Sequence, residues 1–204
     1  FGDIYGTTWE RADDGQLLLT ATGRPQATSE RVKLGNYQPD MVGGLTNTFN
    51  YKDFAFNFLV DFRIGGEVYS GTDASLDASG VSKRSLQFRE GGVTVDGVWD
   101  DGGTLKPNTT NVSSQDYWGS VSGIASEYIY EQTNVRLREV SLSYNFPKNI
   151  LENSFIKNAS VSLTGRNLFF FYKKSDNFDP ETSYSTSNFA QGVLFYNLPT
   201  TRSL

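Results

Sequence analysis

One ten-residue segment constrains the fold of this chain more than any other. Between residues 54 and 63 a large apolar side chain stands at every second position, and most of the intervening side chains are small or polar. A period of two residues is typical of a β-strand whose two faces meet different surroundings. The length also matches the roughly 9–11 residues that a tilted strand needs to cross a bilayer. The apolar positions are Phe54, Phe56, Phe58, Val60 and Phe62.

The preceding segment, residues 41–51, predicts a second strand that pairs with the first in a tight hairpin. Only Lys52 and Asp53 separate the two segments. In a two-residue hairpin the turn sets the register, so the apolar positions of both strands fall on one side of the sheet. The expected partners are Tyr51 with Phe54, Phe49 with Phe56, and Leu45 with Val60.

Two later segments, residues 135–146 and 156–172, repeat the division into an apolar and a polar face. Pro147 ends the first of them, since proline cannot donate to a strand ladder. By simple alternation Arg136 and Arg138 share the apolar face near its end, where a membrane interface with anionic headgroups tolerates arginine. The apolar positions are Val140, Leu142 and Tyr144 in the first segment and Val161 and Leu163 in the second.

Four strands with the same two faces favour an all-β fold of antiparallel transmembrane β-barrel strands. In this interpretation the apolar faces touch lipid and the polar faces line the lumen. A soluble β-sandwich would instead bury the apolar faces in a core, and this alternative stays open. The side chains predicted to face lipid are Leu45, Phe49, Phe54, Phe56, Phe58, Val60, Phe62, Val140, Leu142, Tyr144, Val161 and Leu163.

Long and short connections alternate along the chain. The longest is rich in Gly, Ser, Asp and Thr, and loops of such length are rare in compact domains but normal on the outer side of outer-membrane barrels. The chain starts at Phe1 without a secretory signal, so we expect a piece of a longer protein. We divide it into an extracellular loop and strand region (1–40), a hairpin (41–63), a long extracellular loop (64–134), strands (135–172), and a loop leading to a last strand absent from this sequence (173–204).

Composition removes several classes of function. The chain has no cysteine and no histidine, which excludes disulfides, thiolate or imidazole metal sites and a Ser-His-Asp triad within it. The net charge is −5 and no basic stripe stands out, so we expect no nucleic-acid partner. No run approaches the roughly 18–20 apolar residues of a spanning helix. We therefore expect no catalytic residue, no metal and no cofactor.

Six sets of residues stand in a fixed order along the chain. One is the motif Phe178-Asp179-Pro180-Glu181, and another is Leu198-Pro199-Thr200-Thr201-Arg202-Ser203. The remaining segments are residues 34–40 with 43–54, 61–70, 135–144 and 163–168. Together they resemble the late barrel of the SusC/RagA group of TonB-dependent outer-membrane transporters. The resemblance spans nearly the whole chain and is weakest at residues 71–130.

The resemblance implies the C-terminal part of a barrel of about 22 strands that is plugged by an N-terminal domain. Such proteins lie in the bacterial outer membrane, here of a Bacteroidota-like organism, cross it many times and import oligosaccharides or peptides. The implied partners are a SusD-like surface lipoprotein as a lid, the TonB complex through the missing N-terminal region, and outer-membrane lipid. A soluble all-β carbohydrate-binding module and a non-transporting outer-membrane barrel remain the alternatives.

Two groups of residues are candidates for ligand contact. Trp99, Tyr117 and Trp118 lie in the predicted long loop, where aromatic rings could stack on sugars, anchor the lid, or simply pack the loop onto the barrel rim. Asp61, Arg63 and Arg166 fall on the polar faces, and we interpret them as polar lining rather than as plug or substrate contacts.

A third group consists of the acidic residues Asp176, Asp179 and Glu181. Hard oxygen ligands so close together could bind calcium, but their spacing fits no EF-hand loop. We favour a solvated turn built on Asp179-Pro180. Carboxylate pairs suitable for glycoside hydrolysis cannot be placed from the sequence, and we expect none.

Overall fold

The computed structural model describes residues 2–152, 155–182, 184–185, 187 and 190–204. It divides into two compact units, which we describe separately. The sheet unit comprises residues 38–66, 131–182 and 198–204, and the helix unit comprises residues 1–37, 67–130 and 183–197. No helix among the described residues has the length and apolar character needed to span a membrane.

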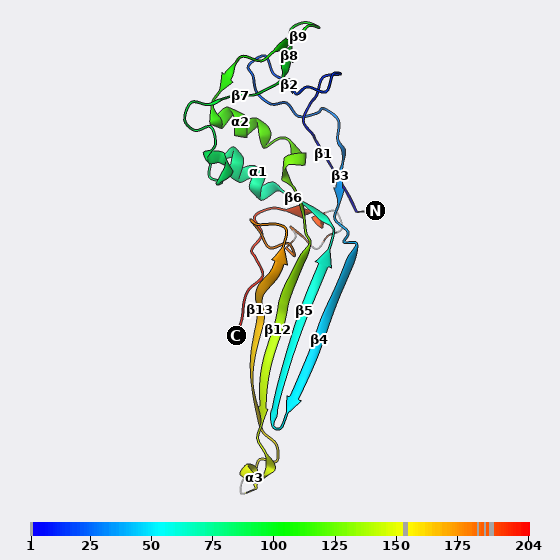
Figure 1. The fold of residues 1–204 in the computed structure, drawn as a ribbon, viewed down its shortest axis with the longest axis vertical. Helices are drawn as coiled ribbons and strands as arrows, with labels where there is room; N and C mark the ends of the chain where they lie inside the picture. The colour runs from blue at the N-terminus through cyan, green and yellow to red at the C-terminus, as the bar shows by residue number, and fades with distance from the viewer. Residues whose placement is uncertain (1, 153–154, 183, 186, 188–189) are drawn as a thin grey trace. The chain divides into compact units, whose positions relative to one another are not determined.

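The sheet unit is built on one antiparallel sheet of four long strands, in the order β13-β12-β5-β4 (Figure 1). The strands are β4 (Met41–Tyr51), β5 (Phe54–Ile64), β12 (Asn134–Asn145) and β13 (Ser160–Lys173). Each has 11 to 14 residues, about the length that a tilted membrane-crossing strand requires. The prediction of long antiparallel strands is confirmed.

The β4–β5 hairpin has the register predicted from the sequence. Lys52 closes the turn in the left-handed region, with φ of 50°, which a tight hairpin turn requires. Near the other end, a Cβ added at Gly43 would lie 2.5 Å from the ring of Phe62. The glycine therefore leaves room for the ring on the apolar face. The predicted partners Tyr51 with Phe54, Phe49 with Phe56, and Leu45 with Val60 are all observed.

The strand β12 lies between β5 and β13 and brings their apolar positions into line. Leu142 is opposite Phe56 on one side and Leu163 on the other. Directly opposite side chains in an antiparallel ladder share a face and stabilise it by about 0.2–1 kcal/mol per pair. Phe54 and Tyr144 form such a pair, with ring centroids 4.8 Å apart.

The connection between β12 and β13 is longer than the one predicted at residues 147–155, because β13 begins at Ser160. Pro147 follows the strand and precedes one turn of helix, α3 (Lys148–Leu151). Residues 153–154 of this turn, and residues 183, 186 and 188–189 of the predicted loop 173–204, lie outside the described residues.

The helix unit contains short strands and two helices. Its helices are α1 (Gly71–Ala78) and α2 (Ser114–Val121), with the 3-10 turns η1 (Arg84–Leu86) and η2 (Ala125–Tyr128). Its sheets have the orders β1-β3, β10-β7, β2-β8-β9 and β11-β6-β14. The strands are β1 (Asp3–Gly6), β2 (Leu18–Leu19), β3 (Val32–Asn36), β6 (Glu67–Ser70), β7 (Val93–Thr94), β8 (Val98–Asp100), β9 (Leu105–Pro107), β10 (Asn111–Val112), β11 (Ile129–Glu131) and β14 (Val193–Leu194).

Residues 64–134, interpreted from the sequence as one long loop, thus carry much secondary structure. Part of the Ser- and Asp-rich composition serves helix capping, since Ser70 and Ser113 each accept a hydrogen bond from the backbone N–H three residues later. The two helices pack around a small core that consists of Ala74, Trp118, Val121 and Tyr128.

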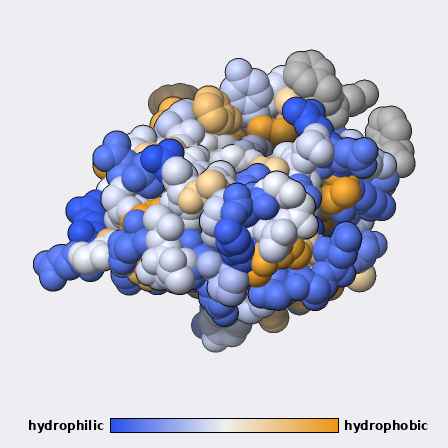
Figure 2. All heavy atoms as spheres, turned by 90° about the horizontal axis from the view of Figure 1, so that it is seen from above, coloured by the Kyte–Doolittle hydropathy of each residue, from blue (hydrophilic) through white to orange (hydrophobic). Residues whose placement is uncertain are grey.

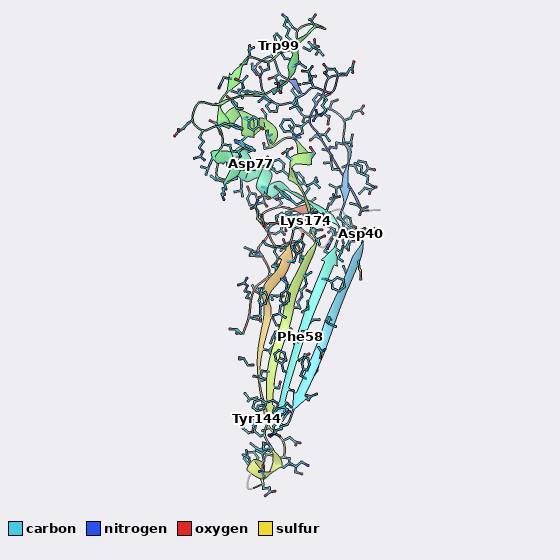
Figure 3. The ribbon with its side chains drawn as sticks, viewed as in Figure 1. Asp40, Phe58, Asp77, Trp99, Tyr144 and Lys174 are labelled. Atoms are coloured by element: carbon cyan, nitrogen blue, oxygen red, sulfur yellow. The ribbon has the colours of Figure 1, made fainter. Side chains whose placement is uncertain are left out.

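A buried polar network strengthens this core. Asp77 is 1 % exposed and accepts hydrogen bonds from Ser82, from Arg84 and from the Tyr128 hydroxyl, the last at 2.9 Å. Burial, followed by the Asp77 carboxylate, raises the pKa of Tyr128, so the hydroxyl keeps its proton and remains a donor. Figure 3 marks Asp77 among the helices.

Candidate functional site

The twelve side chains predicted to face lipid all retain exposed surface within the described structure. Leu163 is 66 % exposed, Leu45 59 % and Phe49 56 %, and Phe58 lies partly exposed midway along the sheet (Figure 3). A sandwich would bury such a face against a second sheet. The described part of the chain therefore does not enclose these side chains in a core, and contact with lipid remains a prediction.

Exposed large apolar side chains occur in both units. Figure 2 shows a face on which hydrophilic side chains predominate and hydrophobic ones form small, separate spots. Along the sheet, by contrast, aromatic rings adjoin one another: Phe49 lies 6.4 Å from Phe56 and 6.3 Å from Phe58, between centroids. A continuous exposed apolar surface marks a site of association with lipid or protein.

The opposite face of the sheet carries charged groups near one end of β12. Arg136 stands directly opposite Asp61 in the ladder between β12 and β5. Arg138 lies at a bulge where this register shifts between Leu137 and Glu139. The extra residue breaks the simple alternation of faces. Arg136 therefore lies on the same face of the sheet as Asp61. The Arg138 guanidinium reaches this face too, where it binds the Asp61 carboxylate. The sequence-based placement of both arginines on the apolar face is wrong.

Arg136 is the centre of a buried group of ion pairs. Its side chain is 2 % exposed, and its Nη2 lies 2.7 Å from Asp179 Oδ1. Its Nη1 donates to Glu181 Oε2 at 3.0 Å and to Thr200 Oγ1 at 2.8 Å. The ring of Phe170 covers the guanidinium, with 4.0 Å from Cζ to the ring centroid. A buried charge is tolerated only when it is paired and hydrogen-bonded, and these contacts meet that condition.

Arg138 extends the same group of charges. Its Nε donates to Asp61 Oδ2 at 2.5 Å, its Nη2 to Glu181 Oε1 at 2.6 Å and its Nη1 to Asn167 Oδ1 at 3.1 Å. Glu181 thus bridges both arginines, with one carboxylate oxygen to each. We call this group the arginine cluster, and it consists of Asp61, Arg136, Arg138, Asp179 and Glu181.

The turn at residues 179–182 is buried, which corrects the prediction of a solvated turn. The Asp179 side chain is 6 % exposed, and its Oδ1 accepts from the Glu181 N–H at 3.1 Å. The Pro180 carbonyl accepts from Gln132 Nε2 at 2.6 Å. The turn forms as expected around Asp-Pro, but tertiary contacts with the sheet remove it from water.

The calcium alternative for Asp176, Asp179 and Glu181 finds no support in this geometry. The Asp179 and Glu181 carboxylates bind arginine side chains. Within the described residues, no group of three or more His, Cys, Asp or Glu side chains is arranged to hold a metal ion.

The Asp179 carboxyl has a pKa below its ordinary value. Burial by itself would raise this pKa, but hydrogen bonds from Arg136, the Thr200 hydroxyl and the Glu181 amide outweigh burial. A carboxyl whose folded pKa is depressed stabilises the fold above its unfolded pKa, about 3.9. That contribution is lost as the pH falls through the folded pKa.

We therefore expect the protection of residues 174–182 to decline progressively once the pH falls below about 4. Hydrogen–deuterium exchange of this segment in the full-length protein would measure the change. Asp179→Asn, which carries no charge to lose, should show weaker protection at neutral pH and little further loss on acidification. If residues 174–182 of the unsubstituted protein kept their full protection at about pH 3, Asp179 would not stabilise this segment in a pH-dependent way.

The other charged residues of the polar face also have partners. Arg63 Nη2 donates to Gln132 Oε1 at 2.8 Å, and Arg166 Nε lies 2.9 Å from Glu139 Oε2. Such mutual pairing favours the interpretation of Arg63, Arg166 and Asp61 as polar lining.

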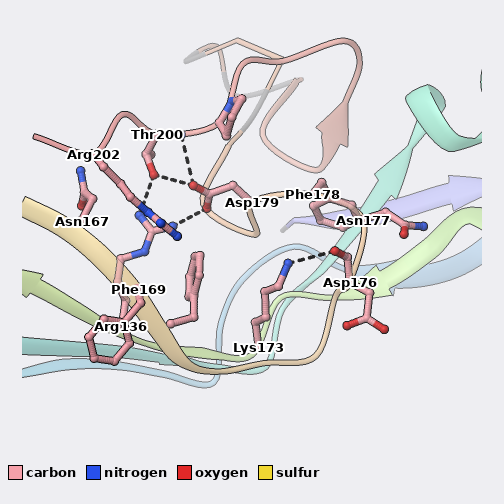
Figure 4. A pocket seen from close by; sticks show the side chains of 12 residues that line it. Arg136, Asn167, Phe169, Lys173, Asp176, Asn177, Phe178, Asp179, Thr200 and Arg202 are labelled. Atoms are coloured by element: carbon pink, nitrogen blue, oxygen red, sulfur yellow. Dashed lines mark hydrogen bonds and ion pairs between the residues drawn. The ribbon is translucent and has the colours of Figure 1, made fainter.

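A pocket of about 510 Å³ opens beside the arginine cluster (Figure 4). It lies where the returning segment 198–204 meets β13. An antiparallel bridge joins Arg166 to Ser203, and Asn167 Nδ2 donates to the Thr201 carbonyl at 3.0 Å. Asn167 adopts a left-handed φ of 52° at an irregularity of β13, which redirects the strand edge. Lining side chains include Arg136, Phe169, Phe170, Lys173, Asp179 and Arg202.

Sequence analysis missed this pocket because its walls are distant in the chain. The sequence pattern did not identify Lys173 and Arg202 as site residues, although Arg202 belongs to the motif at residues 198–203. The bridge between Arg166 and Ser203, together with the hydrogen bond from Asn167 to the Thr201 carbonyl, brings them to one opening.

The aromatic candidates of the helix unit have different surroundings. Trp118 is 6 % exposed and packs in the core with Val121 and Tyr128. Tyr117 is half-buried, and its ring lies edge-on to Trp118 at 5.1 Å. Trp99 lies in β8 with Lys106 Nζ 5.6 Å from its ring centroid (Figure 3). Trp99 is thus better placed than Trp118 for contact with another molecule.

The similar sequences among known proteins share one description, TonB-dependent receptor. No family model matches the chain. TonB-dependent receptor P26 of Formosa agariphila is 30 % identical over 184 residues, which are 87 % of this chain and 17 % of the receptor. TonB-dependent receptor P3 of the same organism is 26 % identical over 175 residues, 85 % of this chain and 16 % of the receptor. The chain therefore spans about a sixth of the length of these curated relatives.

The fold has relatives among solved structures. A structure of the RagAB peptide importer in the closed-closed state matches 98 % of this chain and 22 % of the matched chain, with a TM-score of 0.56 and 17 % identity. A second structure of the RagAB peptide transporter matches with a TM-score of 0.52. These likenesses concern the fold.

Proposed function

We propose that this chain, which is homologous to the barrel region of SusC/RagA-type TonB-dependent receptors, forms wall strands and outer loops of a transporter that imports nutrients across the bacterial outer membrane. The observation that carries the proposal is the two-faced sheet. One face is a continuous exposed apolar surface, the other holds the arginine cluster, and the strands have membrane-crossing length.

In this proposal each part of the chain has a role in transport. The apolar face lies against outer-membrane lipid, and the arginine cluster faces the lumen. Residues 64–134 lie outside the cell, where Trp99 and Tyr117 contact the ligand or a SusD-like lipoprotein lid. Energy arrives from the TonB complex through a region outside this chain. The imported ligands are oligosaccharides or peptides, and the chain performs no covalent chemistry.

The alternatives fit the observations less well. A soluble carbohydrate-binding sandwich needs its apolar side chains in a core, and Leu45 and Leu163 are more than half exposed. An adhesin or assembly component would share the barrel, but the relatives in sequence bear the name of TonB-dependent receptors.

The proposal is tested by probing two adjacent positions of β5. This chain has no cysteine. Phe58→Cys and Asn57→Cys, each made in the full-length protein after any cysteine outside this chain has been replaced, can therefore carry one nitroxide label in liposomes. Since neighbouring residues of a strand point to opposite faces, we expect oxygen, which concentrates in lipid, to relax the label at 58 more strongly. A water-soluble nickel chelate should relax the label at 57 more strongly. Greater chelate access at 58 than at 57 would reject the membrane placement.

A further inference from the structure

The pocket beside the arginine cluster presents positive charge that the described structure does not neutralise. Arg202 is exposed, and its side chain makes no hydrogen bond or ion pair with any described residue. Lys173 Nζ donates to the carbonyl oxygen of Asp176 at 2.9 Å, a neutral acceptor. Arg136, in the same lining, is already occupied by Asp179 and Glu181. Two cations are thus available to a ligand.

Much of the remaining wall of the pocket is apolar or amide-bearing. Phe169 is 45 % exposed, and the ring of Phe170 lies 5.9 Å from Lys173 Nζ. Asn177 also lines the opening. Ligand sites combine apolar walls with a few convergent polar groups. Here the polar groups are chiefly donors, which suit an anionic group attached to a compact organic body.

The carboxylate of Asp176 also lines the pocket and carries the opposite charge. It reduces but does not cancel the preference for an anion. The cations Arg136, Lys173 and Arg202 exceed the carboxylates Asp176 and Asp179 among the lining residues by one charge. Figure 4 shows Asp176 directing its backbone carbonyl, rather than its carboxylate, to Lys173.

We infer that this pocket is a subsite for a carboxylate group of the imported ligand, with Arg202 and Lys173 as its binding residues. An arginine guanidinium can engage both oxygens of a carboxylate, and a lysine ammonium adds a point charge. The inference rests on the proposed function, because the subsite serves import only if the polar face lines the lumen. An acidic sugar and an acidic peptide side chain carry the same group, so the experiment compares both sources.

The test measures binding to the purified full-length protein in detergent by calorimetry. The probes are two matched pairs that differ in one charge: glucuronate with glucose, and the dipeptide Gly-Glu with Gly-Gln. We expect the acidic member of one pair to bind more tightly than its neutral partner. Arg202→Gln and Lys173→Gln should each weaken acidic-probe binding about tenfold, the equivalent of about 1.4 kcal/mol, and leave neutral-probe binding unchanged.

The control is Lys148→Gln, an exposed cation in the short turn between β12 and β13. It changes the net charge equally and should leave the preference intact. The pair that shows the preference identifies the source of the carboxylate. No preference in either pair, or a preference that Arg202→Gln and Lys173→Gln leave intact, overturns the inference. Because binding is measured without transport, such a failure would not affect the result of the nitroxide experiment.

Discussion

Replacement of Arg136 by methionine is expected to destabilise the full-length protein strongly and to lower the amount that is recovered folded. The change leaves the Asp179 carboxylate, which is 6 % exposed, without its arginine partner and removes one of the two arginine partners of Glu181. Breaking a buried ion pair on one side costs about 3–5 kcal/mol, a large share of the total stability of about 5–15 kcal/mol of an ordinary domain. Urea unfolding, together with the amount of protein recovered in the outer membrane, would measure the loss.

Two further variants separate burial from charge. Arg166→Gln breaks an exposed pair, with side chains 64 % and 31 % exposed, and should cost no more than about 1 kcal/mol. Asp179→Asn added to Arg136→Met removes the stranded charge and should restore part of the stability. If Arg136→Met proved as mild as Arg166→Gln, the cluster would not hold the turn to the sheet.

The second large effect is expected from arginine on the apolar face. Phe58→Arg places a charge midway along β5, where contact with the hydrocarbon centre of a bilayer costs about 2–4 kcal/mol. We expect a smaller fraction of folded protein in liposomes. The folded fraction is measured in gel electrophoresis as the band of the unheated sample that shifts to the position of unfolded protein on heating.

Asn57→Arg provides the matched control for this prediction. It adds the same side chain one residue away, on the polar face, where a charge meets the lumen and costs little. Equal loss from both substitutions would mean that the two faces do not differ in their surroundings.

The local part of the fold was predictable because short-range geometry determines it. A two-residue turn at 52–53 leaves one register that puts both apolar faces together, and the structure has that register. The length of the alternating segments likewise predicted the ends of β12 and β13 to within a few residues. These inferences need no knowledge of distant contacts.

Two features could not be predicted, for different reasons. The bulge at Arg138 gives no sign in the pattern of apolar residues, and its partners Asp61 and Glu181 lie 77 and 43 residues away. The second feature is the secondary structure of residues 64–134, which their amino-acid composition did not indicate. Their serines and aspartates resemble those of a loop, whereas Ser70, Asp77 and Ser113 in fact cap or brace helices.

The bulge at Arg138 also changes how much charge one wall of a barrel can hold. A regular strand gives each side one residue in two, which spaces neighbours on a face about 6.6–6.8 Å apart. At the bulge, Arg138 and Glu139 are consecutive and both reach partners on the polar side, Asp61 and Arg166. A single extra residue thus raises the local density of fixed charge on the polar face of the sheet, and it does so without placing either charge on the apolar face.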